Sequence, residues 1–373
     1  MTKLLFEPTK LGALDLTNRV VVAPMCQYSA IGGTMTDWHM VHLGQFALSG
    51  AGLVFVEATG VEPAGRITPG CVGLWNDENE AAMARVIKFF REYGSAKIGI
   101  QLAHAGRKGS CDLPWRGGGS LNADDPRGWE TFAPSAEPFD TDWRVPTALD
   151  AAGLKRIKDA FLQALVRSIR LGFGAVELHS AHGYLLHQFL SPLSNLRNDA
   201  YGGDREGRMR YPLEVFEALR EQCPKNVPLG VRVSATEWVA GGWDLEDTLE
   251  YAKALKDRGC DFIDVSSGGN SSKQQIPAGP GYQAGLAAEI KRTTGMTTIA
   301  VGMITEPYQA ESIIATGQAD MVALARGMLY DPRWPWHAAD ALRADAPFAP
   351  QYQRAHHPFL SRKPVGEPPT GSE

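Results

Sequence analysis

Two histidines and a tyrosine lie close together in the run HSAHGY, at positions His179, His182 and Tyr184. Imidazoles three residues apart on a turn that leaves a strand can point at one ligand atom, and the phenol follows two residues later. Two N–H donors would stabilise a developing oxyanion. A phenol with a pKa of about 10 still holds a proton at neutral pH and can act as a general acid. The pattern therefore indicates an oxygen-binding clamp with Tyr184 as proton donor.

Two other interpretations of the histidine pair remain open at this stage. A metal site of the H-x-x-H type would need a third ligand, and no Cys or carboxylate stands at metal-ligand spacing. The pair could also be structural, with both rings hydrogen-bonded inside the fold. We predict no metal.

The elements that would position these groups are short, apolar and rich in β-branched residues. Continuous apolar character without alternation is typical of parallel strands that are buried on both faces. We predict eight such strands, at 19–24, 52–57, 98–102, 175–179, 229–233, 262–266, 298–301 and 321–325.

Helical patterns alternate with these strands. Apolar residues at a spacing of three to four predict helices at 78–93, 150–171, 204–222, 245–258, 283–293 and 307–315. Eight alternating units without a linker favour a single α/β domain, a (β/α)₈ TIM barrel over residues 1–346, rather than an open doubly wound sheet.

Two segments do not follow the alternation. Residues 104–146, after the third strand, are rich in Gly, Pro and Trp and lack periodicity, which predicts an ordered, lid-like loop anchored by Trp115 and Trp129. The Pro-rich residues 347–373 are predicted to form a C-terminal arm, either intersubunit or disordered.

In such barrels the active site lies at the C-terminal ends of the strands. Besides the HSAHGY run, the groups expected there include Arg232, which is costly inside an apolar strand unless it meets a ligand or a buried carboxylate. Phosphate would bind at the loops after strands 7 and 8, near Gly302 and the Ala325-Arg326 turn. No G-x-G-x-x-G opens a helix and no P-loop occurs, so a Rossmann or Walker site is not supported.

Composition excludes several classes of protein. Over 373 residues, 44% are hydrophobic and 21% charged, with a net charge of −5, which is ordinary for a globular chain and gives no electrostatic reason to bind nucleic acid. We expect no membrane segment, because the apolar runs are too short to span a bilayer. The five cysteines show no C-x-x-C spacing, and with no signal-peptide pattern we expect a cytoplasmic protein.

Several stretches, in order and over nearly the whole chain, resemble the Old Yellow Enzyme family of FMN-dependent ene-reductases. They include LTNRVVVAPMCQYSA (16–30), IGIQLAHAGRKGS (98–110), ELHSAHGYLLHQFLSPLSNLRNDAYGG (177–203) and VALARGMLYDP (322–332). Cys26 with Tyr28 resembles the bacterial, Cys-containing branch, and DLPWRGG in the long loop resembles its xenobiotic reductases.

The resemblance implies an NADPH- or NADH-dependent flavin oxidoreductase that reduces the C=C bond of α,β-unsaturated carbonyl or nitro compounds. His179 and His182 would hold the substrate oxygen and Tyr184 would protonate the α-carbon, with Cys26 and Tyr28 beside the flavin. The implied FMN contacts come from Ala23, Pro24, Met25, Cys26, Gly60, Gln101, Arg232, Gly302, Met303, Ala325 and Arg326.

The resemblance also implies a homodimer or homotetramer, because APQYQRAHH is similar to a C-terminal motif whose Arg reaches a neighbour's active site; here that residue is Arg354. Two alternatives remain open: a flavin-bound redox sensor working through Cys26, and a reductase of xenobiotic nitro compounds or nitrate esters.

Overall fold

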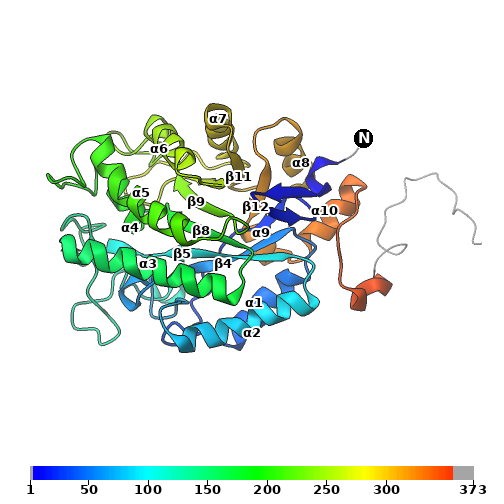
Figure 1. Ribbon diagram of the computed structural model, residues 1–373, viewed down its shortest axis with the longest axis horizontal. Coiled ribbons are helices and arrows are strands. Elements are labelled where there is room, and N and C mark those ends of the chain that lie inside the picture. Colours follow the sequence, from blue (N-terminus) through cyan, green and yellow to red (C-terminus); the bar gives the residue numbers. More distant parts are fainter. Residues whose placement is uncertain (1–2, 356–373) are drawn as a thin grey trace, which may run out of the picture.

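Eight parallel strands close into a barrel in the computed structural model, which describes residues 3–355 (Figure 1). All eight strands predicted from the sequence are confirmed. They are β3 (Val20–Val22), β4 (Leu53–Gly60), β5 (Lys97–Ala103), β8 (Ala175–Ser180), β9 (Leu229–Ser234), β10 (Phe262–Ser266), β11 (Thr297–Val301) and β12 (Met321–Leu324).

Helices surround the barrel (Figure 1). The six predicted helices are confirmed to within one residue at each end. They are α2 (Asp77–Tyr93), α3 (Ala151–Leu171), α5 (Arg205–Gln222), α6 (Leu245–Asp257), α7 (Ala284–Thr294) and α8 (Pro307–Ala315). Asn76, Asp150 and Asp204 accept the first-turn N–H groups of α2, α3 and α5.

Four helices were not predicted: α1 (Asp37–Ala47), α4 (Leu185–Leu190), α9 (Arg326–Tyr330) and α10 (Trp334–Leu342). The apolar pattern of α1 is broken because two of its buried positions are histidines, His39 and His42. At six and five residues, α4 and α9 are too short to show a helical period.

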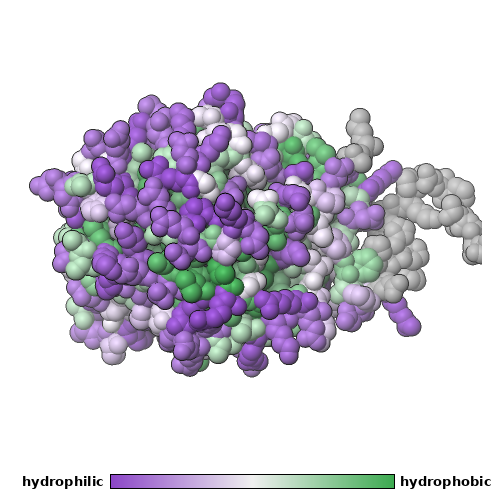
Figure 2. All heavy atoms as spheres, in the orientation of Figure 1, coloured by the Kyte–Doolittle hydropathy of each residue, from purple (hydrophilic) through white to green (hydrophobic). Residues whose placement is uncertain are grey.

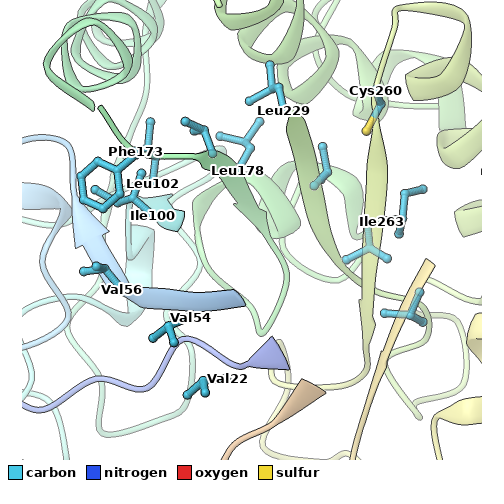
Figure 3. Packing of buried hydrophobic residues seen from close by; sticks show 14 of the residues in the cluster. Val22, Val54, Val56, Ile100, Leu102, Phe173, Leu178, Leu229, Cys260 and Ile263 are labelled. Atoms are coloured by element: carbon cyan, nitrogen blue, oxygen red, sulfur yellow. The ribbon is translucent and has the colours of Figure 1, made fainter. Parts of the chain in front are cut away.

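The core has two parts, because successive strand residues point to opposite faces. Val54, Leu178 and Ile263 belong to the larger cluster, which lies between strands and helices (Figure 3). Phe55 and Phe262 belong to a second cluster inside the barrel. Each fully buried Val, Leu or Phe contributes about 1.5–3 kcal/mol through the hydrophobic effect.

A hairpin of β1 (Thr9–Leu11) and β2 (Leu14–Leu16) covers the N-terminal end of the barrel (Figure 1). Its Leu11 and Leu16 are buried in the interior cluster, against residues of the strand starts such as Leu53 and Ala175. The opposite end, where the strands finish, is therefore the one left for a ligand.

The long segment between β5 and α3 is ordered. It contains two 3₁₀ turns (Gly106–Lys108 and Pro114–Arg116), and the short strands β6 (Phe132–Ala133) and β7 (Thr147–Ala148) pair in it. Trp129 packs as expected: its ring lies 4.7 Å from the Arg66 guanidinium carbon, and its Nε1 donates to the Ala64 carbonyl at 3.2 Å. Trp115 instead is 63% exposed and meets Tyr28 edge-on. The lid function of this segment remains a prediction.

The C-terminal part ends, as described, in a 3₁₀ helix, η5 (Pro350–Ala355), whose Tyr352 ring packs 6.0 Å from that of Trp336. Residues 356–373, most of the predicted arm, lie outside the described residues.

Polar side chains cover most of the face seen in Figure 2. Within residues 3–355, no helix has the length and apolar character needed to cross a membrane.

Candidate active site

The barrel interior changes from apolar to polar along its axis. On β8, alternation places Ala175, Glu177 and His179 on one face, and Ala175 belongs to the interior apolar cluster. The neighbouring strands continue the polar layer above that cluster. Its members are Gln101 of β5, Glu177 of β8, Arg232 of β9 and Asp264 of β10, all buried.

This polar layer contains two carboxyl groups and one guanidinium. Gln101 Nε2 donates to Glu177 Oε1 at 2.7 Å, and Arg232 Nε lies 3.6 Å from Asp264 Oδ2. Asp264 is thus the buried carboxylate that the position of Arg232 led us to expect. Burial raises the pKa of Glu177, and the nearby Asp264 raises it further; burial also raises the pKa of Asp264. The pair therefore keeps a proton that isolated carboxyls would lose.

His179, His182 and Tyr184 converge above this layer. His179 Nε2 and His182 Nδ1 are 3.3 Å apart, and the Tyr184 ring stands edge-on to the His179 ring with centroids 5.0 Å apart. Arg232 pairs in register with His179. The three predicted side chains thus contact one another at the C-terminal end of β8.

Hydrogen bonds limit which nitrogens carry protons. His179 Nδ1 accepts from the Ala181 N–H, so the neutral ring carries its proton on Nε2 and directs it toward His182. His182 Nε2 lies 2.7 Å from the Ser266 hydroxyl, which can either accept or donate. When Ser266 donates, the His182 proton moves to Nδ1, and an oxygen that lies beside the two nitrogens can then accept from both N–H groups.

The titration behaviour of these groups suits a neutral clamp and a protonated acid. Burial, followed by the charge of Arg232, lowers the pKa of His179 and of His182 well below the usual value. Burial raises the pKa of Tyr184 well above its usual value. At neutral pH both imidazoles are uncharged donors and the phenol holds its proton.

Strained backbone gathers at this end of the barrel. Six non-glycine residues among those described have a positive φ, and five of them follow barrel strands: Tyr28, Ser110, His182, Trp238 and Met303. Each such residue costs of order 1–3 kcal/mol, and this strain is typical of functional sites. The sixth, Arg343, ends α10.

The turn after β3 carries a further group of predicted residues. Ala23 is buried, and Pro24, Met25, Cys26 and Tyr28 are partly exposed. Burial raises the pKa of the Cys26 thiol, and the charge of the adjacent Glu57 raises it further. Cys26 is therefore a protonated thiol in this fold. The other four cysteines are free and buried, as expected for structural residues.

Glu57 also anchors this turn. Its Oε2 accepts the Gln27 N–H at 3.1 Å, and its Oε1 lies 3.5 Å from Nε2 of the buried His39. The helix missed in the sequence, α1, supplies this histidine.

The remaining predicted cofactor residues also lie at strand ends. Gly60 ends β4, Gly302 and Met303 follow β11, and Ala325 and Arg326 follow β12. The backbone of Gly302 has φ 128°, and a Cβ there would lie 2.6 Å from Gln283 Nε2, so the position requires glycine. Arg326 is exposed. Arg354 is not at this end; it lies exposed in η5.

Sequence reasoning missed a second set of buried groups behind the HSAHGY turn. His187 Nδ1 accepts the Gly183 N–H at 2.8 Å, and its Nε2 lies 3.1 Å from Glu237 Oε1. Glu237 also accepts from Ser191, Trp243 and Asn270.

Lys108 was missed from the sequence as well. Its Nζ donates to the carbonyl of His182 at 2.9 Å and to that of Gly269 at 2.6 Å. Among the described residues no cluster of His, Cys, Asp or Glu could hold a metal ion.

A closed parallel barrel with convergent donors at its strand ends is the architecture of a barrel enzyme. The chain belongs to the NADH:flavin oxidoreductase / NADH oxidase family, whose model matches residues 4–345. It is 40% identical to an NADPH dehydrogenase of Geobacillus thermodenitrificans over 95% of this chain and 99% of the relative. An NADPH dehydrogenase of Bacillus subtilis (strain 168) is similar to the same extent. The structure of morphinone reductase matches with a TM-score of 0.75 and 28% identity, over 92% of this chain and 90% of that one.

The chain is therefore an FMN- and nicotinamide-dependent oxidoreductase of the Old Yellow Enzyme type, as its sequence motifs implied. The polar layer fits a flavin. Arg232 Nε is buried and has no hydrogen-bond partner among the described residues, and Gln101 lies two strands away. A guanidinium beside an amide suits the imide edge of a flavin, and the positive charge would stabilise a reduced, anionic flavin.

Proposed function

We propose that this enzyme reduces the C=C bond of α,β-unsaturated carbonyl or nitro compounds. His179 and His182 bind the carbonyl or nitro oxygen, and Tyr184 protonates the α-carbon. FMN, when bound, would supply the hydride chemistry, with NADPH or NADH as the reductant. The observation that carries the proposal is the convergence of two neutral imidazoles and one protonated phenol at the C-terminal end of β8.

The clamp acts on the oxygen where negative charge develops during hydride transfer. Two N–H donors, His179 Nε2 and His182 Nδ1 in the tautomer that Ser266 allows, would face that oxygen. Losing one such donor typically costs about 10²–10³ in rate, because the donors are fixed in place before the reaction.

The cofactor contacts are proposed by position. Gln101 and Arg232 would bond the pyrimidine edge, and Ala23, Pro24, Met25, Cys26 and Gly60 would line the flavin ring. Gly302, Met303, Ala325 and Arg326 would hold the phosphate, since they follow the last two strands, where barrels bind phosphate. Tyr28 would close the pocket over the substrate. We also propose that the enzyme is cytoplasmic and forms a homodimer or homotetramer.

The test separates the two half-reactions in an anaerobic stopped-flow experiment. Tyr184→Phe should slow reoxidation of the reduced enzyme by cyclohexenone at least tenfold and leave flavin reduction by NADPH within about twofold. Equal loss of both half-reactions would contradict the proton-donor role. A wild-type enzyme that cannot turn over any enone or nitroalkene would instead favour a redox sensor working through Cys26.

A further inference from the structure

Lys108 is a half-buried cation beside the proposed proton donor. It stands in the 3₁₀ turn after β5, and its Nζ lies 5.3 Å from the centroid of the Tyr184 ring and 4.7 Å from that of Phe139. Two of its three N–H donors are occupied by the carbonyls of His182 and Gly269. The ammonium group is thereby held over the face of the phenol.

No carboxylate within residues 3–355 forms an ion pair with this ammonium. The ionisable groups that act on it are Arg107, which lowers the pKa of Lys108, and Cys111, which raises it; His179 and His182 face it as neutral rings. Burial is the largest influence and lowers the pKa of Lys108 to about 8. A cation that is desolvated without a counter-ion costs stability. The Tyr184 ring is the nearby side chain that could gain a negative charge, and its centroid lies 5.3 Å from the ammonium nitrogen.

We propose that Lys108 is a positioning residue that stabilises Tyr184 as a phenolate while this tyrosine gives its proton to the substrate. In that step the O–H bond of Tyr184 breaks, a C–H bond forms at the α-carbon of the substrate enolate, and the negative charge moves from the enolate to the phenolate. Water then returns a proton to the phenolate. Because the charge of a phenolate extends into its ring, an ammonium over the ring face stabilises it more than it stabilises the phenol.

This proposal rests on the proposed function of Tyr184, so its test is a double-mutant cycle. Lys108→Met should slow reoxidation of the reduced enzyme by cyclohexenone about 10- to 100-fold at pH 7 when Tyr184 is present. In the Tyr184→Phe background the same substitution should change that rate less than about twofold. Lys108→Met should leave flavin reduction by NADPH nearly unchanged.

The outcomes separate the two hypotheses. If Lys108→Met slows reoxidation equally in both backgrounds, or in neither, the role of Lys108 is overturned while Tyr184 can still be the proton donor. If Tyr184→Phe alone has no effect on reoxidation, the proposed function of Tyr184 fails, and the role of Lys108 fails with it.

The pH dependence separates an electrostatic role from a merely structural one. In the wild type, the rate of reoxidation should fall as pH rises above about 8, where Lys108 loses its charge. Lys108→Arg should restore the rate at pH 7 and move the decline to higher pH, since guanidinium stays charged. A decline at the same pH in Lys108→Arg would overturn the proposal. FMN content and phenol binding verify that each variant is folded. Lys155→Met, which replaces an exposed lysine on α3 in the same way, is the matched control.

Discussion

By donating to His182, Ser266 can set which nitrogen of that ring carries the proton, without touching the substrate. Its hydroxyl lies 2.7 Å from His182 Nε2, and only when it donates does His182 present an N–H from Nδ1 beside His179. Ser266→Ala removes this partner from a buried position. A hydrogen bond of this kind contributes about 0.5–1.5 kcal/mol, so binding should weaken roughly 2- to 10-fold. The measurement is titration of the holoenzyme with p-hydroxybenzaldehyde, followed by its long-wavelength absorbance band. Unchanged affinity would show that Ser266 does not set the tautomer.

The buried histidines make stability depend on pH in a direction that can be worked out. The pKa of His42 is lowered to about 4, mainly by burial, and those of His179 and His182 are also well below the usual value of about 6.5. As pH falls below 6.5 the unfolded chain takes up these protons and the native protein does not. Stability therefore decreases, by up to about 1.4 kcal/mol per histidine and pH unit.

Urea unfolding at pH 7 and pH 5 measures this loss. The variant His179→Asn with His182→Asn should lose less stability between the two pH values than the wild type. An equal or larger loss in the variant would mean that the two imidazoles do not carry the effect.

Among the elements, the strands were predictable because both of their faces are buried, so their apolar runs are nearly continuous. Helix α3 was predictable because one side faces the barrel and the other faces water. Of the polar layer, Arg232 was recognised from its charge inside an apolar strand and Gln101 from the family resemblance, whereas Glu177 and Asp264 were missed. A charged residue inside an apolar strand is costly unless it has a partner. This rule also applies to Glu177 in AVELH and to Asp264 in FIDVS. Lys108 could not be placed from sequence, because the carbonyl of Gly269 that it binds is 161 residues away.

The charges of β8, β9 and β10 act on the flavin together. Arg232 faces Asp264 at 3.6 Å, so part of its positive charge is already compensated. Asp264→Asn removes that compensation, and an anionic reduced flavin at Arg232 would then be favoured. We expect the two-electron midpoint potential to rise by roughly 20–60 mV, equivalent to about 1–3 kcal/mol.

A matched substitution distinguishes charge from general disturbance of the layer. Glu177→Gln keeps an oxygen for the Gln101 amide and replaces a carboxyl whose pKa is raised by burial and by Asp264. It should change the potential by less than about 15 mV. Spectroelectrochemical titration at pH 7 measures both variants. A potential that falls in Asp264→Asn would contradict the proposed place of the flavin.

At the scale of the whole molecule, the two ends of the barrel differ: one is closed by a hairpin, and the other carries the candidate active site. The hairpin β1–β2 closes one end, and η5 lies on the same side in Figure 1, whereas the loops of the segment between β5 and α3 lie at the other side, where the strands finish. Arg354, exposed in η5, is therefore far from the pocket of its own chain. If it serves a pocket at all, that pocket belongs to a neighbour.

Subunit mixing tests this directly. We expect light scattering to show a dimer or tetramer, and Arg354→Ala to raise KM for cyclohexenone while FMN content stays unchanged. A Tyr184→Phe subunit lacks the proton donor but still offers Arg354 to its neighbour, and an Arg354→Ala subunit has the converse defect. Co-refolded mixtures should therefore recover part of the activity, because some pockets combine an intact Tyr184 with an intact Arg354 from the adjacent chain. Activity equal to the average of the two parent variants would show that Arg354 does not complete a neighbouring pocket, and a monomeric mass would exclude the arrangement outright.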